Sequence, residues 1–569
     1  MVKNFNLVVF VNILVFILGC RSALRAEDSI QVRSDNFTLS GQIDGAQGVD
    51  MISELERFRS ALLEIHNLPA STKDNRVDIY IVSDSEIFDI LGVNENFVAI
   101  YAPTPAGPRA LINGSEGVLD ASAGSDLRSS LRHEYAHHFT RTYLSLTEPV
   151  WLSEGLAEFY AGYAENEDGS YQIGTAHDGH VEVLSYPIHG WSDMRDVLSS
   201  FRKIKHARYP SHTSPADWSR RPDNVTFFYA QSWGLIHWAL NRSGTTEIES
   251  GSKMLNSLVD RLLINDMPVT RDLSHWPDLQ AMRIDTPTKD DAIVQSVAAE
   301  FNLPLLKGVK EEPESKSLER MISDYIAAGV PSITRRPHPD RVTASVSVKT
   351  LTPANAAAVQ YRQLSLTAGS RALINPRMKS LKAEVEASPE AASSLILSEA
   401  AQQYATGGTQ SAVNHVAEAK RLNLITPEDE ALLLQIAFGD FTNRYFQNPE
   451  AMRRKLRPAL SQTPDDINLL VMMAMTGLGD IRDAGAEFAP EAQTALQRLE
   501  QRNVAKHRPL MTMPLINLYA TQEDDKSALF LLYRAMAFQP SNQFELRRAA
   551  EQLEERLNGP NPQKTQHPY

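Results

Sequence analysis

The chain has 569 residues, which is long enough for two or more domains. Its content of 42% hydrophobic and 22% charged residues is that of an ordinary globular protein. The formal net charge of −14 and the lack of a basic stripe argue against nucleic acid as a partner, because no cationic surface would neutralise phosphates.

Residues 1–26 have the pattern of a targeting leader and are kept apart from the fold. An apolar run from Leu7 to Leu18 follows a short positive start and is too short to span a bilayer comfortably. The run leads into Gly19-Cys20, which looks like the end of a bacterial lipobox, so Cys20 is the expected lipidation site. An ordinary signal peptide cut near Ala26 is the alternative.

Both readings predict an exported protein. A lipidated Cys20 would anchor the chain to a membrane, and we then expect a cell-envelope lipoprotein that faces the periplasm. Cleavage as an ordinary signal peptide would instead give a soluble periplasmic or secreted protein. Because Cys20 is the only cysteine, no internal disulfide is expected.

Three short segments after the leader predict strands. They span Val77–Val82, Phe97–Tyr101 and Arg109–Asn113, and Pro, Gly or Asn lies near their ends. The first two are rich in β-branched and aromatic residues, which favour a pleated and partly buried backbone. We expect these segments to belong to a small sheet.

The segment 131–139 contains the pattern His133-Glu134-x-x-His137. In a helix, positions i and i+4 share one face, so the two imidazoles could hold a single Zn²⁺ ion. The carboxylate of Glu134 would then lie beside the ion, where it can act as a general base.

A second motif supplies the third ligand that a catalytic zinc requires. The segment 150–160 contains Trp151-Leu152-Ser153-Glu154-Gly155 and, one turn later, Glu158. Glu154 follows His137 by 17 positions, enough for a helix end, a loop and a second helix. Glu154 can ligate while Glu158, at i+4 on the same face, accepts an N–H from a ligating histidine.

The pair of motifs resembles the gluzincin branch of zinc metallopeptidases, the thermolysin- and aminopeptidase-like group of the peptidase MA superfamily. The resemblance implies one Zn²⁺ per chain on His133, His137 and Glu154, with Glu134 as base and Glu158 behind the ligands. It also implies an α+β zincin-type domain with a small mixed sheet, over about residues 30–330, whose edge strand pairs with a peptide substrate. The distance to the third ligand is slightly shorter than in many aminopeptidases, so their specificity for N-termini does not transfer.

The segment Phe227–Trp238 predicts a mostly apolar helix, and related gluzincin-like proteins carry a similar Tyr-Ala-Gln-Ser-Trp stretch. Tyr229 is the candidate hydroxyl donor to the oxyanion of a tetrahedral intermediate. The competing interpretation is that Tyr229, Trp233 and His237, at i, i+4 spacing, form a packing stripe in the core.

The C-terminal part predicts a different architecture, an all-α solenoid over residues 353–558. Ser/Thr-Pro-acid triplets at 388–390, 426–428 and 463–465 recur every 37 or 38 residues, and each fits the first turn of a helix. The pattern resembles tetratricopeptide repeats, which bind a peptide or protein partner on a concave face. Bracing of the first domain is the alternative role. Residues 331–352 are expected to form a linker with a β-like segment, and 559–569 a disordered tail.

The motifs together predict a zinc metallopeptidase that hydrolyses peptide bonds of a peptide or protein substrate. One alternative is a non-catalytic, membrane-tethered scaffold whose solenoid binds protein partners and whose zincin domain is structural or vestigial. Another is a zinc hydrolase that acts on a different substrate, such as a cell-wall peptide.

Overall fold

The structure is a computed structural model, and it describes most of residues 29–241 together with separate helices and strands farther along the chain. The described residues are 29–66, 68, 76–82, 99–104, 107–114, 127–144, 149–199, 222–241, 314–330, 333–335, 345–365, 371–386, 449–462, 464–477, 489–501 and 543–558, with single positions at 258, 295 and 297 and within 395–400 and 519–532. Cys20 with the rest of the leader, and the tail at 559–569, lie outside these residues.

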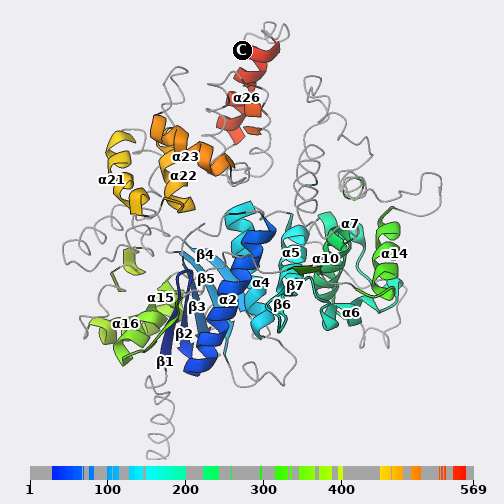
Figure 1. Ribbon diagram of the computed structural model, residues 1–569, viewed down its shortest axis with the longest axis horizontal. Helices are drawn as coiled ribbons and strands as arrows, with labels where there is room; N and C mark the ends of the chain where they lie inside the picture. Colours follow the sequence, from blue (N-terminus) through cyan, green and yellow to red (C-terminus); the bar gives the residue numbers. More distant parts are fainter. Residues whose placement is uncertain are drawn as a thin grey trace, which may run out of the picture.

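A six-stranded mixed sheet forms the first part of the fold, in the order β4-β5-β3-β2-β1-β9 (Figure 1). Strands β2, β3 and β5 run parallel to one another, whereas β4, β1 and β9 pair in antiparallel fashion with their neighbours. The strands are β1 (Ser29–Arg33), β2 (Phe37–Gln42), β3 (Val77–Val82), β4 (Ala99–Thr104), β5 (Gly107–Asn113) and β9 (Ser347–Thr350). The three strands predicted from the sequence thus overlap with β3, β4 and β5.

Strand β3 shows how the sequence directs side chains to the two faces of the sheet. Successive side chains of a strand point in opposite directions. Ile79 and Ile81 therefore join one buried cluster, and Tyr80 and Val82 join a second cluster on the opposite face. A central strand that is covered on both faces is expected to be almost wholly apolar, as β3 is.

Helices cover both faces of this sheet. On one face lie α2 (Gly45–Ile65) and α4 (Leu127–Phe139). The start of α2 is capped by Asp44, whose side chain accepts from the N–H groups of Ala46 and Gln47. On the other face, α15 (Pro353–Ser365) and α16 (Arg371–Glu386) enclose the second buried cluster (Figure 1).

A group of helices continues from the α4 side of the sheet. Helix α5 (Val150–Ala161) packs against α4 and also against α10 (Asn224–Asn241), the apolar helix predicted from the sequence. Helix α10 is flanked in turn by α6 (Asp178–Leu184), α7 (Met194–Ser199) and α14 (Glu314–Ala327). The packing of α5 on α10 is close, because a Cβ atom at Gly155 would lie 2.6 Å from the carbonyl oxygen of Ser232.

The segment predicted as a linker contributes to both sheets of the fold. Strand β8 (Ile333–Arg335) pairs with β7 (Tyr171–Ile173), which also pairs with β6 (Ala164–Glu165) in a second, three-stranded sheet. Strand β9 pairs with β1, and the helices α15 and α16 that follow lie on the main sheet. The predicted boundary near residue 330 therefore differs from the structure, in which residues up to 386 belong with the sheet.

Farther along the chain the described elements are all helical. They are α21 (Pro449–Gln462), α22 (Ile467–Met475), α23 (Pro490–Gln501) and α26 (Gln543–Asn558). The triplets at 388–390 and 426–428 lie outside the described residues. At the third triplet, α22 begins at Ile467, and its first turn is capped by Asp466, which accepts from the N–H of Leu469. The solenoid remains a prediction.

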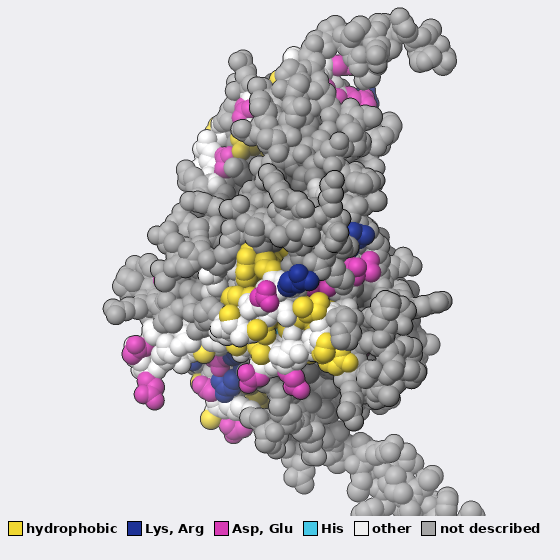
Figure 2. Space-filling model, turned by 90° about the vertical axis from the view of Figure 1, so that its right-hand side faces the viewer, with side chains coloured by type: hydrophobic (Ala, Val, Ile, Leu, Met, Phe, Trp, Pro, Cys, Tyr) yellow, Lys and Arg dark blue, Asp and Glu magenta, His cyan; other side chains and the backbone are white. Residues whose placement is uncertain are grey.

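No helix in the described part of the chain has both the length and the apolar character needed to cross a bilayer. Figure 2 shows one face of the molecule, on which Asp and Glu side chains are scattered over the described region and a few Lys and Arg side chains lie among them. This distribution agrees with the formal net charge of −14.

Candidate metal centre

Helix α4 presents two imidazoles from successive turns. His133 and His137 lie on one face of the helix, and their Nε2 atoms are 3.0 Å apart. Their rings meet nearly edge to face, with centroids 4.7 Å apart. This arrangement follows from the i, i+4 spacing in the sequence.

Helix α5 brings a carboxylate to the same point. Glu154 Oε2 lies 3.4 Å from His133 Nε2 and 3.3 Å from His137 Nε2. The three ligand atoms all lie within 4.8 Å of one another, so His133, His137 and Glu154 could hold a metal ion. Among the described residues, these three are the His, Cys, Asp or Glu side chains whose ligand atoms converge closely enough to hold a metal ion.

The other nitrogen of each imidazole is held by a residue of α5. Glu158 Oε1 lies 3.2 Å from His133 Nδ1, which is the position expected for an outer carboxylate. Ser153 Oγ lies 3.3 Å from His137 Nδ1. Partners of this kind fix the tautomer and direction of a ligating imidazole, so that each Nε2 faces Glu154. Ser153 was not singled out from the sequence, although it directly precedes Glu154.

Glu134 is buried between the helix and the edge of the main sheet. Its carboxylate accepts a hydrogen bond from the backbone N–H of Tyr101 in β4. Burial raises the pKa of Glu134, and the nearby charges of His133 and His137 oppose part of that rise. A buried carboxyl group with a raised pKa suits a residue that must accept a proton and release it again.

His138, which follows the ligand His137, belongs to the packing around the site. Its Nδ1 lies 3.1 Å from the hydroxyl of Tyr101, and the side chain is buried. Tyr101 therefore joins β4 to α4 twice, through its backbone N–H to Glu134 and through its hydroxyl to His138.

The charges of the cluster favour a cation between its members. Burial alone would raise the pKa of Glu154, but hydrogen bonds and charge from His133 and His137 lower it to about 2. Burial alone would lower the pKa of His133, but the charge of Glu158 and hydrogen bonds with both glutamates raise it well above its usual range. The carboxylates of Glu154 and Glu158, whose pKa values are both lowered, therefore stay ionised and stabilise positive charge at the centre.

Tyr229 extends from α10 toward the same cluster. Its ring centroid lies 6.5 Å from that of His133, and the side chain is half-buried. Burial raises the pKa of its hydroxyl, and the negative charges of Glu154, Glu158 and Glu134 add to this effect, so the phenol keeps its proton. Trp233 and His237, farther along the stripe, are fully buried in the core. The stripe therefore runs from the site into the core, and both interpretations of Tyr229 remain compatible with its position.

His180 is a further neighbour that the sequence analysis missed. It comes from α6, and its Nε2 lies 3.0 Å from Glu158 Oε2. No spacing in the sequence links His180 to Glu158, because β6 and β7 intervene between their helices. Only the packing of α6 on α10 brings the two side chains together.

The donor set could hold a metal ion, and its atoms are of the kinds that bind zinc. Two imidazole nitrogens and one carboxylate oxygen converge, and the Nδ1 atom of each imidazole contacts a polar side chain of α5. Zinc in hydrolases commonly has three such protein ligands and keeps a fourth position for water or substrate. No protein-family model and no curated protein matches this chain.

Proposed function

We propose that the protein is an exported, zinc-dependent peptidase of the gluzincin type. The observation that carries this proposal is the convergence of His133 Nε2, His137 Nε2 and Glu154 Oε2, with Glu134 buried beside them. A zinc ion held by these three residues would supply Lewis acidity, which polarises a carbonyl group and lowers the pKa of water.

Glu134 is the proposed general base. Its carboxylate takes a proton from the attacking water and later delivers that proton to the nitrogen of the leaving amine. The hydrogen bond from the backbone N–H of Tyr101 fixes the orientation of this carboxylate during the transfer. Tyr229, kept neutral by its surroundings, is the proposed donor to the developing oxyanion.

A peptide is the proposed substrate because the site borders a strand at the edge of the sheet. Strand β4 is the end strand next to α4, and it pairs on its other side with β5. The N–H of Tyr101 points away from β5 toward Glu134, so the alternate residue Ala99 also directs its N–H and C=O outward, and Pro103, which has no N–H, directs its C=O outward. An extended peptide can add to such an edge by backbone hydrogen bonds.

The location of the protein and its C-terminal partner complete the proposal. The leader favours a lipoprotein anchored at Cys20 in the cell envelope, and the alternative is a soluble periplasmic or secreted enzyme. The helices that follow α16 are proposed to form a TPR-like solenoid that binds a protein partner. Helices α15 and α16 are not part of that solenoid, because they pack on the main sheet.

The proposal is tested by metal content and hydrolysis in the same preparations. We expect about one zinc per chain by elemental mass spectrometry in the wild-type protein and much less in Glu154→Ala. Glu134→Gln should keep its zinc and lose cleavage of a fluorogenic protein substrate such as labelled casein. Cell-wall peptide fragments, assayed in parallel, distinguish a protein substrate from a cell-wall one.

Each outcome has a clear meaning. Hydrolysis that persists in Glu134→Gln would show that Glu134 is not the base. Zinc without hydrolysis of either substrate class would favour the scaffold function, and absence of zinc after reconstitution would reject the metal centre.

A further inference from the structure

The carboxylate of Glu158 lies between two histidines that come from different helices. Its Oε1 lies 3.2 Å from Nδ1 of His133, and its Oε2 lies 3.0 Å from Nε2 of His180. The side chains of Glu158 and His180 are only 16% and 12% exposed, so water competes weakly for these contacts. The contact with His180 is a close polar contact and not a straight hydrogen bond, because the Nε2–H bond does not point directly at the oxygen.

His180 is itself held in place by the core. Its ring centroid lies 5.4 Å from that of Trp233 and 4.5 Å from that of His177. Trp233 is fully buried on α10, the helix that carries Tyr229 one turn earlier. At the other end of α6, Leu184 closes onto Gly234, where a Cβ atom would lie 3.0 Å from Leu184 Cδ1. Helix α6 is therefore packed against α10 at both ends, and this packing holds His180 at a defined position.

We infer that His180 is a positioning residue for the metal centre, acting through Glu158 on His133. This inference rests on the proposed function. With one oxygen held by His180, the Glu158 carboxylate cannot rotate freely, and its second oxygen stays directed at His133 Nδ1. The imidazole of His133 then keeps its Nε2 facing Glu154 and His137. Outer carboxylates of this kind typically change metal affinity by about 10- to 100-fold, and one link farther out we expect about 5- to 10-fold.

Two substitutions at His180 separate this role from simple packing. His180→Phe keeps an aromatic ring against Trp233 and removes the donor that faces Glu158. His180→Gln loses the ring and keeps an N–H donor of similar reach. A positioning role predicts that Gln is the milder change for zinc binding, whereas a packing role predicts that Phe is the milder one.

The experiment is a zinc competition titration of the full-length protein against a chromophoric chelator. We expect zinc affinity to fall about 5- to 10-fold in His180→Phe and to stay within about twofold of wild type in His180→Gln. His177→Phe is the matched control, because the exposed His177 directly precedes α6 and a phenyl ring keeps its contact with the ring of His180, so the zinc affinity of this variant should remain unchanged. The visible spectrum of the Co²⁺-substituted protein should shift in His180→Phe and not in His180→Gln.

The outcomes are distinguishable. If the wild type binds zinc, and if the Phe and Gln variants bind it equally well or in the reverse order, the positioning role is wrong and the proposed function stands. If the wild type binds no zinc, the proposed function and this inference both fall.

Discussion

The Nε–H of Arg132 on α4 donates to the carbonyl oxygen of Ala161 at the end of α5, over 2.9 Å. This bond joins the helix that bears the two candidate histidine ligands to the helix that bears Glu154. The guanidinium of Arg132 also forms an ion pair with Glu54 on α2, and the arginine side chain is only 10% exposed. One residue next to His133 therefore fixes the relative positions of three helices.

Replacement of this arginine should loosen both the fold and the site. Arg132→Met removes a largely buried charged hydrogen bond, and we expect the free energy of unfolding to fall by about 2–3 kcal/mol. Zinc affinity should fall as well, since α4 and α5 carry different ligands. All six tryptophans lie between Trp151 and Trp276, so tryptophan fluorescence in a urea titration reports the unfolding of this region.

Arg128→Met is the matched control for that measurement. Arg128 lies one turn earlier on α4 and pairs with Asp50 and Glu54 on α2, but its side chain is 37% exposed. A pair that exposed contributes about 0–1 kcal/mol. Equal losses of stability in the two variants would show that the bond to Ala161 contributes little.

Gly155 is predicted to be intolerant of alanine for a steric reason. A Cβ atom there would lie 2.6 Å from the backbone oxygen of Ser232 and 2.8 Å from Cγ1 of Ile236, so α5 would have to move away from α10. We expect Gly155→Ala to cost about 1–3 kcal/mol of stability and to weaken zinc binding, because Glu154 is the adjacent residue. Gly45→Ala, where the nearest atom is 3.9 Å away, should leave both properties unchanged.

The sequence predicts the ligand cluster because its information is local. The i, i+4 spacings of His133 with His137 and of Glu154 with Glu158 determine which side chains share a helix face. The docking of the two helices then brings the faces together. The strands β3, β4 and β5 are likewise visible as β-branched or apolar segments between turn residues.

Long-range pairing is what the sequence could not reveal. The contact between Ser347 and Arg33 joins β9 to β1 across 314 positions, and no local pattern specifies such a partner. The pairing shifts the predicted domain boundary and turns α15 and α16 into a cover for the sheet. The approach of His180 to Glu158 is hidden for the same reason, since it depends on tertiary packing.

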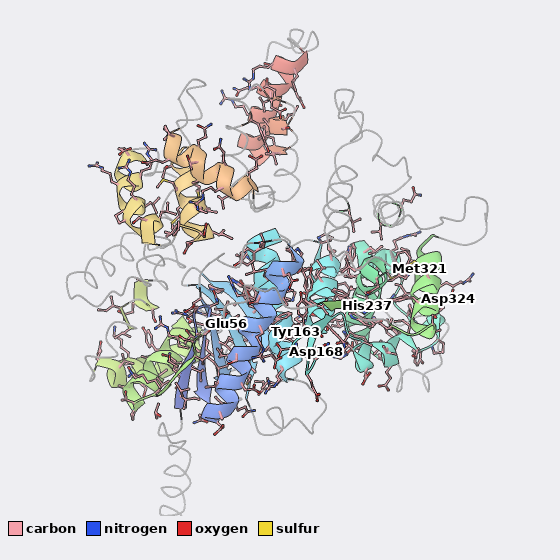
Figure 3. The ribbon with its side chains drawn as sticks, in the orientation of Figure 1. Glu56, Tyr163, Asp168, His237, Met321 and Asp324 are labelled. Atoms are coloured by element: carbon pink, nitrogen blue, oxygen red, sulfur yellow. The ribbon has the colours of Figure 1, made fainter. Side chains whose placement is uncertain are left out.

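Tyr229 allows a direct choice between catalysis and packing. Tyr229→Phe keeps the ring beside His133 and Phe228 and removes the hydroxyl alone. If the hydroxyl stabilises the oxyanion, kcat should fall about 100-fold with little change in KM or zinc content. Tyr163→Phe, which removes a hydroxyl that donates to Glu165 (Tyr163 is labelled in Figure 3), should leave kcat unchanged. An unchanged kcat in Tyr229→Phe would assign the residue to packing.

His237 should make the stability of this region depend on pH. The imidazole, labelled in Figure 3, is fully buried among α10, α14 and the end of β7. Its Nε2 lies 2.5 Å from the carbonyl oxygen of Gly174, and its Nδ1 lies 2.8 Å from the hydroxyl of Tyr325. Burial lowers the pKa of His237 to about 4. Between about pH 6.5 and pH 4 the unfolded chain therefore binds a proton at this residue that the folded protein does not bind.

The sign of the effect follows from that difference in bound protons. Above about pH 6.5 the imidazole is neutral in both states and adds no pH dependence, whereas acidification toward pH 4 removes about 3 kcal/mol of stability through His237. His237→Gln lacks the titrating group, so its unfolding free energy should fall less steeply over this range, although the variant is less stable at pH 7.5. Urea titrations with chelator present, from pH 4.5 to pH 7.5, measure the difference between the two proteins. Because other groups contribute equally to both slopes, parallel curves would mean that His237 takes up its proton in the folded protein as readily as in the unfolded chain.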